Sequence, residues 1–198
     1  MTAGAYPRKR VEDVLIKGKL PPSYRIIPRQ HLDTPLGVEP ADSRFCAKAD
    51  GYAILYATPD FAAAFIEVIV RDRFARKKHR KLLLKEVTER AWARIVTKPR
   101  AKLALLDLRN DGCVRLGAPT DAVNARNHAA GRGLGRAIHV EHKDIDGFIF
   151  SSRLTDADVY AIFDRGISKL AATDTELLSD HPDLPALLSD YEIRLLAT

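Results

Sequence analysis

The chain has 198 residues, of which 46% are hydrophobic, and a formal net charge of +6. This length and apolar content suit one folded domain with a full core and exclude wholesale disorder. The positive charge favours anionic partners such as nucleotides, nucleic acid or an acidic protein, but it does not select among them.

Two cysteines, Cys46 and Cys113, stand far apart without a CxxC spacing. They exclude a cysteine-based zinc cluster and a disulfide scaffold, and they suit a reducing compartment. Met1 to Arg10 carry basic charge with no apolar run behind it, and no stretch approaches the roughly 20 apolar residues of a membrane span. We therefore expect a cytoplasmic protein without a signal peptide and without a membrane partner.

The first third of the chain predicts a helix, a loop and two strands. An amphipathic pattern over residues 8–20 predicts a short helix that Pro21-Pro22 ends. Tyr24 to Ile27 predicts a short strand, and the prolines and glycine of residues 28–43 predict an irregular loop. Ala53 to Ala57 (AILYA) is typical of a buried strand.

A helix is predicted next. Thr58-Pro59 combines an N-cap threonine with a proline at the first helical position, and the helix is expected to run to about Arg71. The charged residues 72–90 are predicted to be helical as well. The core face of the first of these helices is predicted to consist of Phe61, Phe65, Val68 and Ile69.

The second half of the chain alternates strands with helical segments. Strands are predicted at Ala91–Val96, Leu103–Leu108, Phe148–Phe150 and Val159–Phe163, with a last edge strand at 191–195. Residues 120–138 are predicted to be helical but broken by three glycines, and leucines at helical spacing over 177–188 predict another helix. The short, unevenly spaced strands favour a mixed α+β domain over a repeated βαβ fold.

Glu67 is the only charged residue in the segment Phe61–Val70. On a helix, Ala63 and Ala64 would lie on the same face as this acid. Their small side chains would leave open space beside the carboxylate for a ligand. The alternative is an ordinary solvated acid on the outer face of an amphipathic helix, and the pattern alone favours that alternative.

Two other positions combine a polar group with neighbours that suit a ligand. Arg44 stands beside Phe45 and near Lys48, and its planar fork of donors suits a phosphate or an aromatic ring. Tyr56 lies in a buried strand, where its hydroxyl needs a partner. A surface arginine and a core tyrosine are the plainer interpretations of these residues.

Ser151 and Ser152 directly follow the strand GFIF. Hydroxyl groups at the end of a strand can face a cleft, and they can equally cap a turn. No GxSxG elbow surrounds these serines, so serine-hydrolase chemistry has little support.

Taken together and in this order, these segments resemble the RES domain, a family named for arginine, glutamate and serine. The resemblance covers roughly residues 22–165. It is carried by Arg44-Phe45, Ile54–Ala57, Phe61–Glu67, Leu103–Leu108, Asp146–Arg153 and Val159–Arg165, with Tyr24-Arg25 before them.

Some positions depart from the family pattern. The family often has two glycines before the arginine, where this chain has Asp42 and Ser43. An asparagine usually follows the aromatic residue, where this chain has Cys46. A proline commonly precedes the serine, where this chain has Ser151; the arginine that follows Ser152 favours Ser152 as the family's serine.

The resemblance implies an ADP-ribosyltransferase-like RES fold of the mixed α+β class, with short strands and packed helices. We expect this RES domain over residues 22–165, a helical extension over 1–21, and a C-terminal extension over 166–198 packed on the same domain. Known RES proteins are toxins that deplete NAD by phosphorolysis or hydrolysis, and an adjacent Xre-type antitoxin usually holds them inactive. The implied partners are therefore NAD and an Xre-type antitoxin, with phosphate as a co-substrate of the phosphorolytic reaction and no cofactor or metal.

The resemblance also implies a catalytic set of Arg44, Glu67 and Ser152. Glu67 would stabilise the oxocarbenium-like ribose as nicotinamide leaves, and Ser152 would hydrogen-bond the ligand nearby. Arg44 would pair with the pyrophosphate, with Lys48 as a weaker helper, and Tyr56 would stack near the nicotinamide or its ribose. The substrate-binding set implied in this way is Arg44, Phe45, Lys48, Tyr56 and Ser152.

Three other signals carry less weight. The basic stretch Arg71–Lys81 suits a solvated helix face better than a nucleic-acid site, and a dock for an acidic antitoxin is a third interpretation. The GxGxG of Gly131–Gly135 lacks the spacing and the preceding strand of a dinucleotide fingerprint and predicts a flexible turn. His139, Glu141 and His142 match no common metal-site spacing.

Two further functions stay open from the sequence. One is transfer of ADP-ribose to a protein. The other is a catalytically silent protein that holds a nucleotide or nucleic acid on the same scaffold. The sequence does not determine whether phosphate, water or protein accepts the ADP-ribose, or whether the chain forms a homo-oligomer.

Overall fold

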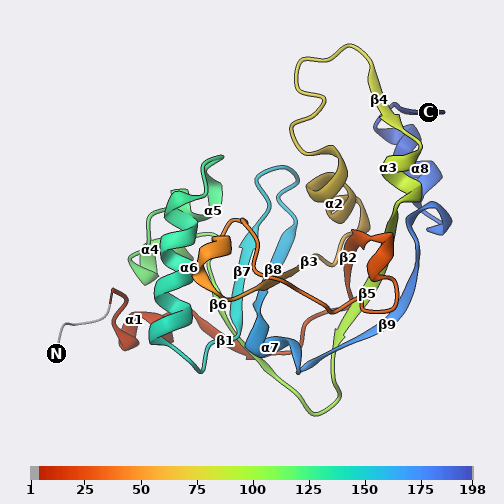
Figure 1. Ribbon diagram of the computed structural model, residues 1–198. Coiled ribbons are helices and arrows are strands. Elements are labelled where there is room, and N and C mark those ends of the chain that lie inside the picture. Colours follow the sequence, from red (N-terminus) through yellow and green to blue (C-terminus); the bar gives the residue numbers. More distant parts are fainter. Residues whose placement is uncertain (1–4, 198) are drawn as a thin grey trace.

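The computed structural model describes residues 5–197, in which helices pack on three β-sheets (Figure 1). The largest sheet has five strands in the order β1-β6-β7-β8-β3. Their bounds are Leu15–Gly18 (β1), Ile54–Ala57 (β3), Leu103–Asp107 (β6), Gly147–Ser151 (β7) and Asp158–Phe163 (β8). Only the β6–β7 pair of this sheet is parallel, so the described chain has the mixed α+β architecture that its short strands predict.

Two smaller sheets flank this one. The antiparallel sheet β2-β5-β9 consists of Ser23–Pro28 (β2), Arg90–Thr97 (β5) and Leu170–Leu177 (β9). The sheet β10-β4 pairs Ile193–Leu196 (β10) in parallel with Arg80–Leu83 (β4). Residues 166–197 thus supply one strand to each small sheet.

Helix α6 is the longest helix of the described chain and covers one face of the five-stranded sheet (Figure 1). The helices are Arg8–Asp13 (α1), Phe61–Phe65 (α2), Lys85–Thr88 (α3), Gly112–Leu116 (α4), Asp121–Asn124 (α5), Ala129–Glu141 (α6), Asp164–Ile167 (α7) and Leu184–Asp190 (α8). Among residues 5–197, no helix combines the length and the apolar character needed to cross a membrane.

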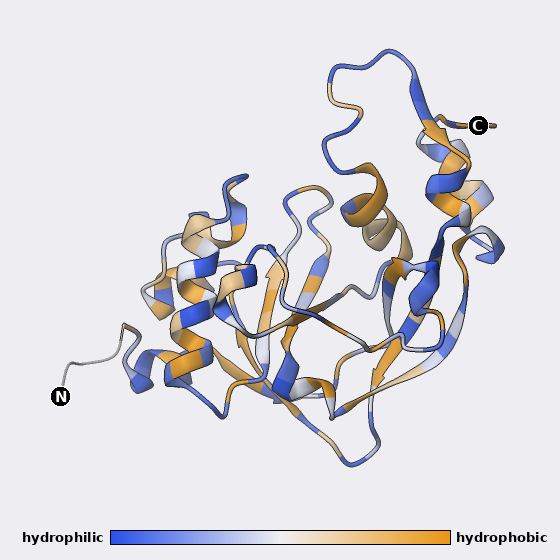
Figure 2. Cartoon of the chain, viewed as in Figure 1, coloured by the Kyte–Doolittle hydropathy of each residue, from blue (hydrophilic) through white to orange (hydrophobic). Residues whose placement is uncertain are grey.

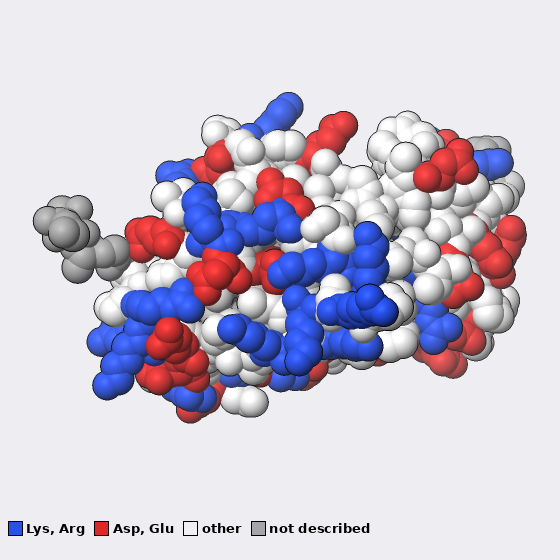
Figure 3. All heavy atoms as spheres, turned by 90° about the horizontal axis from the view of Figure 1, so that it is seen from below, with Lys and Arg blue, Asp and Glu red and all other residues white. Residues whose placement is uncertain are grey.

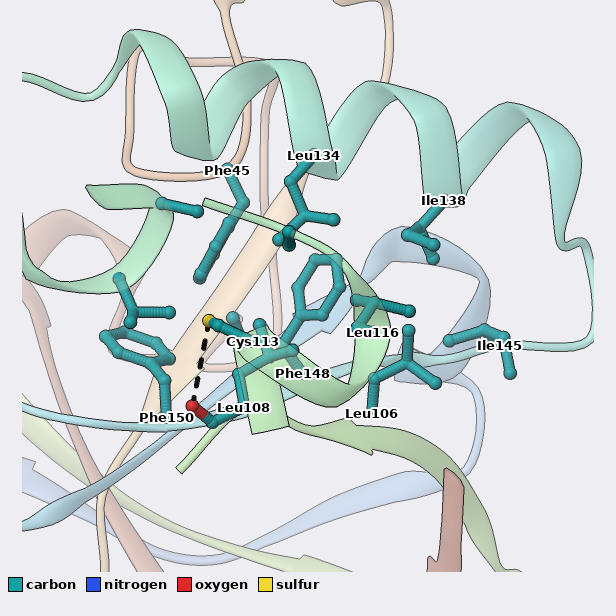
Figure 4. Close-up of a cluster of buried hydrophobic side chains, with 14 of the residues drawn as sticks. Phe45, Leu106, Leu108, Cys113, Leu116, Leu134, Ile138, Ile145, Phe148 and Phe150 are labelled. Atoms are coloured by element: carbon teal, nitrogen blue, oxygen red, sulfur yellow. Dashed lines mark hydrogen bonds between the residues drawn. The ribbon is translucent and has the colours of Figure 1, made fainter. Parts of the chain in front are cut away.

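The main hydrophobic core lies between α6 and the five-stranded sheet. Figure 4 shows Leu134 and Ile138 pointing from α6 toward the aromatic side chains of the sheet. The Phe45 ring is fully buried there, with its centroid 4.6 Å from that of Phe148 and 5.2 Å from that of Phe150. Figure 2 shows by hydropathy that the central strands are apolar and that the loop after α2 is hydrophilic.

Two helix predictions are wrong because tertiary pairing overrides the local pattern. The helix predicted over residues 8–20 ends at Asp13, and Leu15–Gly18 instead forms β1 on the edge of β6. Residues 72–90, also predicted to be helical, form turns, β4 and the short α3. Dense like charges in that segment would repel one another on a helix, whereas strand β4 buries Leu82 in a second core cluster.

The helix that carries Glu67 begins later than predicted. Its N-cap is Asp60, which accepts a hydrogen bond from the Ala62 amide (2.8 Å), whereas Thr58 forms a bridge with Tyr24. After Phe65 the helix widens into a π-helical turn, Ile66–Val70. A π turn holds an additional residue and so rotates the following side chains, and Val68, predicted for the core face, is 38% exposed.

The glycines of α6 do not break the helix, contrary to the prediction of a flexible turn. A Cβ atom on Gly135 would lie 1.9 Å from the Phe45 carbonyl oxygen, and one on Gly131 would lie 2.4 Å from the Arg44 carbonyl oxygen. At Gly133, which faces solvent, an added Cβ would meet nothing within 4 Å. Two of the three glycines therefore let α6 lie directly against the backbone that carries Arg44.

This packing predicts opposite effects for two neighbouring substitutions. Gly133→Ala should raise the free energy of unfolding by about 0.5–1 kcal/mol, because alanine favours an exposed helix position. Gly135→Ala should lower it by about 1–3 kcal/mol, because the new methyl group has no space. Urea denaturation of both variants measures this difference, and equal effects would contradict the close contact between α6 and Phe45.

Candidate functional site

Three adjoining cavities meet at the Glu67 side chain. Their volumes are ≈ 230, ≈ 280 and ≈ 50 Å³. Tyr56 and Val68 line both larger cavities, and Arg44 lines the second and the third. Together they form one cleft within the size range of small-molecule sites, about 300–1,000 Å³.

The carboxylate of Glu67 is half-buried and held in place by a hydrogen bond. Ser152 Oγ donates to Glu67 Oε1 at 2.5 Å, across 85 residues of sequence. Glu67 stands on the π-helical turn, which ends where Arg71 adopts a φ of 47°. π turns and non-glycine residues with positive φ occur frequently at functional sites, so the backbone itself marks this position.

The Ser152 hydroxyl group donates one hydrogen bond and accepts two. The side chain is buried, and Oγ accepts hydrogen bonds from the amides of Leu154 (3.0 Å) and Thr155 (3.2 Å). A serine hydroxyl has one proton and two lone pairs, so its proton is directed at Glu67. Ser151 ends β7 beside it, and the geometry joins Ser152 rather than Ser151 to the carboxylate.

Arg44 reaches the same cleft from the long loop before β3. Its Nη1 donates to the carbonyl of Ala125 (3.0 Å), and its guanidinium carbon lies 5.8 Å from the centre of the Phe150 ring. Burial lowers the pKa of Arg44, although nearby Tyr56 and Glu67 oppose that shift. An arginine nevertheless stays charged in a protein, so the cleft sets a cation near the Glu67 carboxylate.

Tyr56 fixes the residues on both sides of Arg44. Its hydroxyl donates to Ser43 Oγ (3.0 Å) and accepts from the Phe45 amide (3.3 Å). Burial raises the pKa of Tyr56 to about 12, so the phenol stays neutral and keeps both hydrogen bonds. The tyrosine that the sequence suggests as a stacking residue therefore also shapes the loop.

Two of the predicted binding residues lie outside the cleft. Phe45 is buried under α6 in the main core and lines none of the three cavities. Lys48 is exposed and also lines none of them. The Lys48 amide donates to Asp42 Oδ1 (3.0 Å) at the start of a short 3₁₀ turn, Lys48–Asp50. The lysine side chain lies on the surface.

Sequence reasoning missed several residues of the cleft. Arg25 lines the first cavity and donates to the carbonyls of Pro35 (2.9 Å) and Gly37 (3.0 Å). Burial lowers its pKa to about 10. Only the family resemblance points to the pair Tyr24-Arg25, and no local pattern marks it as part of a site.

The third cavity is rich in arginine. It is lined by Arg44, Glu67, Arg71, Asp72, Arg126, His128, Arg153 and Leu154. Burial, and then the neighbouring Arg44, lower the pKa of His128, so its ring is neutral near pH 7. These residues come from four distant segments, and only the fold reveals that they meet.

Positive charge also gathers elsewhere. Figure 3 shows lysines and arginines over much of the underside of the molecule, below the sheets of Figure 1. Lys98, Arg100 and Lys102 are exposed on the turn between β5 and β6. The net charge of the chain therefore does not locate the cleft, and the paired side chains around Glu67 do.

The fold and the cleft define an α+β protein with an acidic residue set among arginines. The chain belongs to the RES domain family, whose model matches residues 22–186. The probable toxin y4kH of Sinorhizobium fredii (strain NBRC 101917 / NGR234) is 37% identical over 95 residues, which are 48% of this chain and 75% of that protein. A solved structure, that of the M. tuberculosis MbcT-MbcA toxin-antitoxin complex, contains a chain of similar fold, with a TM-score of 0.64 and 16% identity, covering 92% of this chain and 94% of that chain.

The two serines differ in the hydrogen bonds that their hydroxyl groups make, and unfolding measurements test that difference. Ser152→Ala should lower the free energy of unfolding by about 1–3 kcal/mol, because it leaves two backbone amides of a turn unpaired. The Ser151 hydroxyl makes no hydrogen bond within residues 5–197. Ser151→Ala should therefore change the free energy of unfolding by no more than about 0.5 kcal/mol. Thermal and urea unfolding measure both variants, and a larger effect at Ser151 would refute the assignment.

Proposed function

We propose that this protein is an NAD-consuming toxin that cleaves the bond between nicotinamide and ribose. The observation that carries the proposal is the Glu67 carboxylate, which Ser152 holds in a cleft whose other walls bear arginines. A carboxylate suits developing positive charge, and guanidinium groups suit a pyrophosphate. NAD contains both a ribose on which positive charge develops and a pyrophosphate.

The proposed reaction needs little acid catalysis by the protein. The nicotinamide of NAD is already cationic, so the bond to C1′ of the ribose breaks with both electrons moving onto nicotinamide, which leaves neutral. Positive charge then develops on the ribose, as in other glycosyl transfers. Glu67 stabilises that charge, and the hydrogen bond from Ser152 keeps the carboxylate aimed at it.

The remaining residues of the cleft bind and orient the dinucleotide. Arg44 pairs with the pyrophosphate, and Phe150 and the Ala125 carbonyl hold its guanidinium in position. Tyr56 lines both larger cavities and offers a ring to the nicotinamide or its ribose. Arg25 lies in the first cavity as a second cation. The proposed reaction needs no cofactor and no metal.

We further propose that a separate antitoxin, of the Xre type that the resemblance implies, holds the protein inactive. Support comes from the relative described as a probable toxin and from the similar fold in a toxin-antitoxin complex. Co-expression with such a partner should restore growth to cells that the protein alone arrests.

Transfer of ADP-ribose to a protein is the second candidate function, because the cleft opens to solvent beside Glu67.

Release of nicotinamide from NAD by the purified protein tests the proposal. Glu67→Gln should slow this release by about 10²–10³, or about 2.7–4 kcal/mol, since the amide cannot stabilise the cationic ribose. Glu176→Gln, an exposed position on β9, serves as the matched control and should retain the full rate. An unchanged rate in Glu67→Gln would refute the role of Glu67.

The product distinguishes the acceptors. ADP-ribose indicates water, ADP-ribose 1″-phosphate indicates phosphate, and label that moves from NAD onto macromolecules in a lysate indicates protein. Absence of all three products together with tight NAD binding would instead support a catalytically silent nucleotide-binding protein.

A further inference from the structure

Two arginines converge on a single oxygen atom beside the catalytic cleft. Arg153 donates from Nη2 to Asp72 Oδ2 at 2.9 Å. Arg126 reaches the same oxygen from Nε at 3.2 Å and lies 3.0 Å from it at Nη2. The three segments that meet here are the end of the π-helical turn, the loop between α5 and α6, and the turn between β7 and β8. The fold thus presents several N–H donors to one anionic oxygen.

The charges around this oxygen are unbalanced. The cavity of ≈ 50 Å³ is lined by four arginines but by only two carboxylates, those of Glu67 and Asp72. His128 adds a neutral ring, because burial and then the neighbouring arginines lower its pKa. Arg44 is assigned to the pyrophosphate, so the other three arginines exceed the two carboxylates by one charge, and by two once Asp72 has moved away. That surplus suits a hydrogen-phosphate dianion, because guanidinium groups favour oxyanions of this geometry.

We propose that Arg71, Arg126 and Arg153, here termed the anion cluster, bind inorganic phosphate, and that Asp72 occupies this position when phosphate is absent. The inference rests on the proposed function, because it assigns phosphate as the acceptor of ADP-ribose. Asp72 Oδ2 stands where a phosphate oxygen would stand. The cluster shares its cavity with Glu67, so phosphate bound there lies beside the carboxylate that faces the ribose.

The Asp72 side chain can leave at low cost. It is 36% exposed and the Arg126 side chain is 73% exposed, and ion pairs this open to solvent are weak. Asp72 also directly follows Arg71, whose φ of 47° is unfavourable for a residue with a side chain. Displacement of the aspartate therefore breaks no buried contact, and phosphate gains the same donors with a larger charge.

The step balances without a further reactant. The bond from C1′ to nicotinamide breaks with its electrons on nicotinamide, and an oxygen of the phosphate dianion forms the new bond to C1′. The product is ADP-ribose 1″-phosphate, and no base is needed because that oxygen is already ionised. The arginines of the cavity offset the repulsion between phosphate and the Glu67 carboxylate.

Titration of inorganic phosphate into the purified protein without NAD, followed by calorimetry, tests the site. Asp72→Asn should bind phosphate about two- to fivefold more tightly, because a competing charge is removed. Arg126→Ala should bind it about two- to fivefold more weakly. Arg100→Ala, on the exposed turn between β5 and β6, is the matched control and should bind as the wild type does.

Equal phosphate affinity in wild type, Asp72→Asn and Arg126→Ala would overturn the inference, as would an effect of Arg100→Ala as large as that of Arg126→Ala. The same titration of Glu67→Gln in saturating NAD separates the acceptor from the pyrophosphate of NAD. Retained phosphate binding supports an acceptor site. Loss of phosphate binding in NAD means that the cluster receives the pyrophosphate, and it overturns the acceptor assignment.

The nicotinamide assay keeps this inference apart from the proposed function. If the wild type releases no nicotinamide but the phosphate titration follows the predicted order, the proposed function fails and the anion site stands. If nicotinamide release is fast, needs no phosphate and is unchanged in Arg126→Ala, the proposed function stands and the acceptor site is overturned.

Discussion

The hydrogen bond from Ser152 to Glu67 is the interaction on which the cleft depends. It joins the turn after β7 to the π-helical turn after α2, two segments that lie 85 residues apart in the sequence. Because Ser152 also accepts two amide hydrogen bonds from its own turn, the direction of its proton is set, and with it the position of the carboxylate. Ala64 lines the space beside Glu67, as the sequence pattern suggests.

The opposite wall depends on how closely the backbone around Arg44 can approach its neighbours. Gly131 and Gly135 let α6 contact the carbonyls of Arg44 and Phe45, and the Tyr56 hydroxyl holds the loop from the other side. The loop is irregular, yet it is fixed at several points. A cation is therefore presented to the cleft with little freedom, which suits the binding of a phosphate group.

The sequence predicts the elements whose signal is local. The strands β2, β3 and β5 to β8 and the isolated acid at Glu67 follow from hydrophobic runs interrupted by turn residues. Strand β9 could not be predicted in this way, because its residues from Thr173 to Glu176 are polar and form no hydrophobic run. The contacts of Asp72 with Arg126 and Arg153 could not be predicted either, since these residues meet only after three segments have folded together. The departures from the family pattern are explained locally: Cys46 donates to the Tyr52 carbonyl (2.9 Å) in the core, away from the cleft, and Ser43 pairs with Tyr56.

Amide hydrogen exchange of Glu67→Gln with and without NAD tests most directly whether this cleft is the dinucleotide site. If NAD binds in this cleft, it slows exchange over residues 43–45, 66–72 and 152–155, and leaves β4 and β10 unchanged. A second basic cavity of ≈ 480 Å³ lies at those two strands and is lined in part by Lys78, Arg80, Lys81 and Arg194. Slower exchange confined to β4 and β10, or no change around Glu67, would contradict the account.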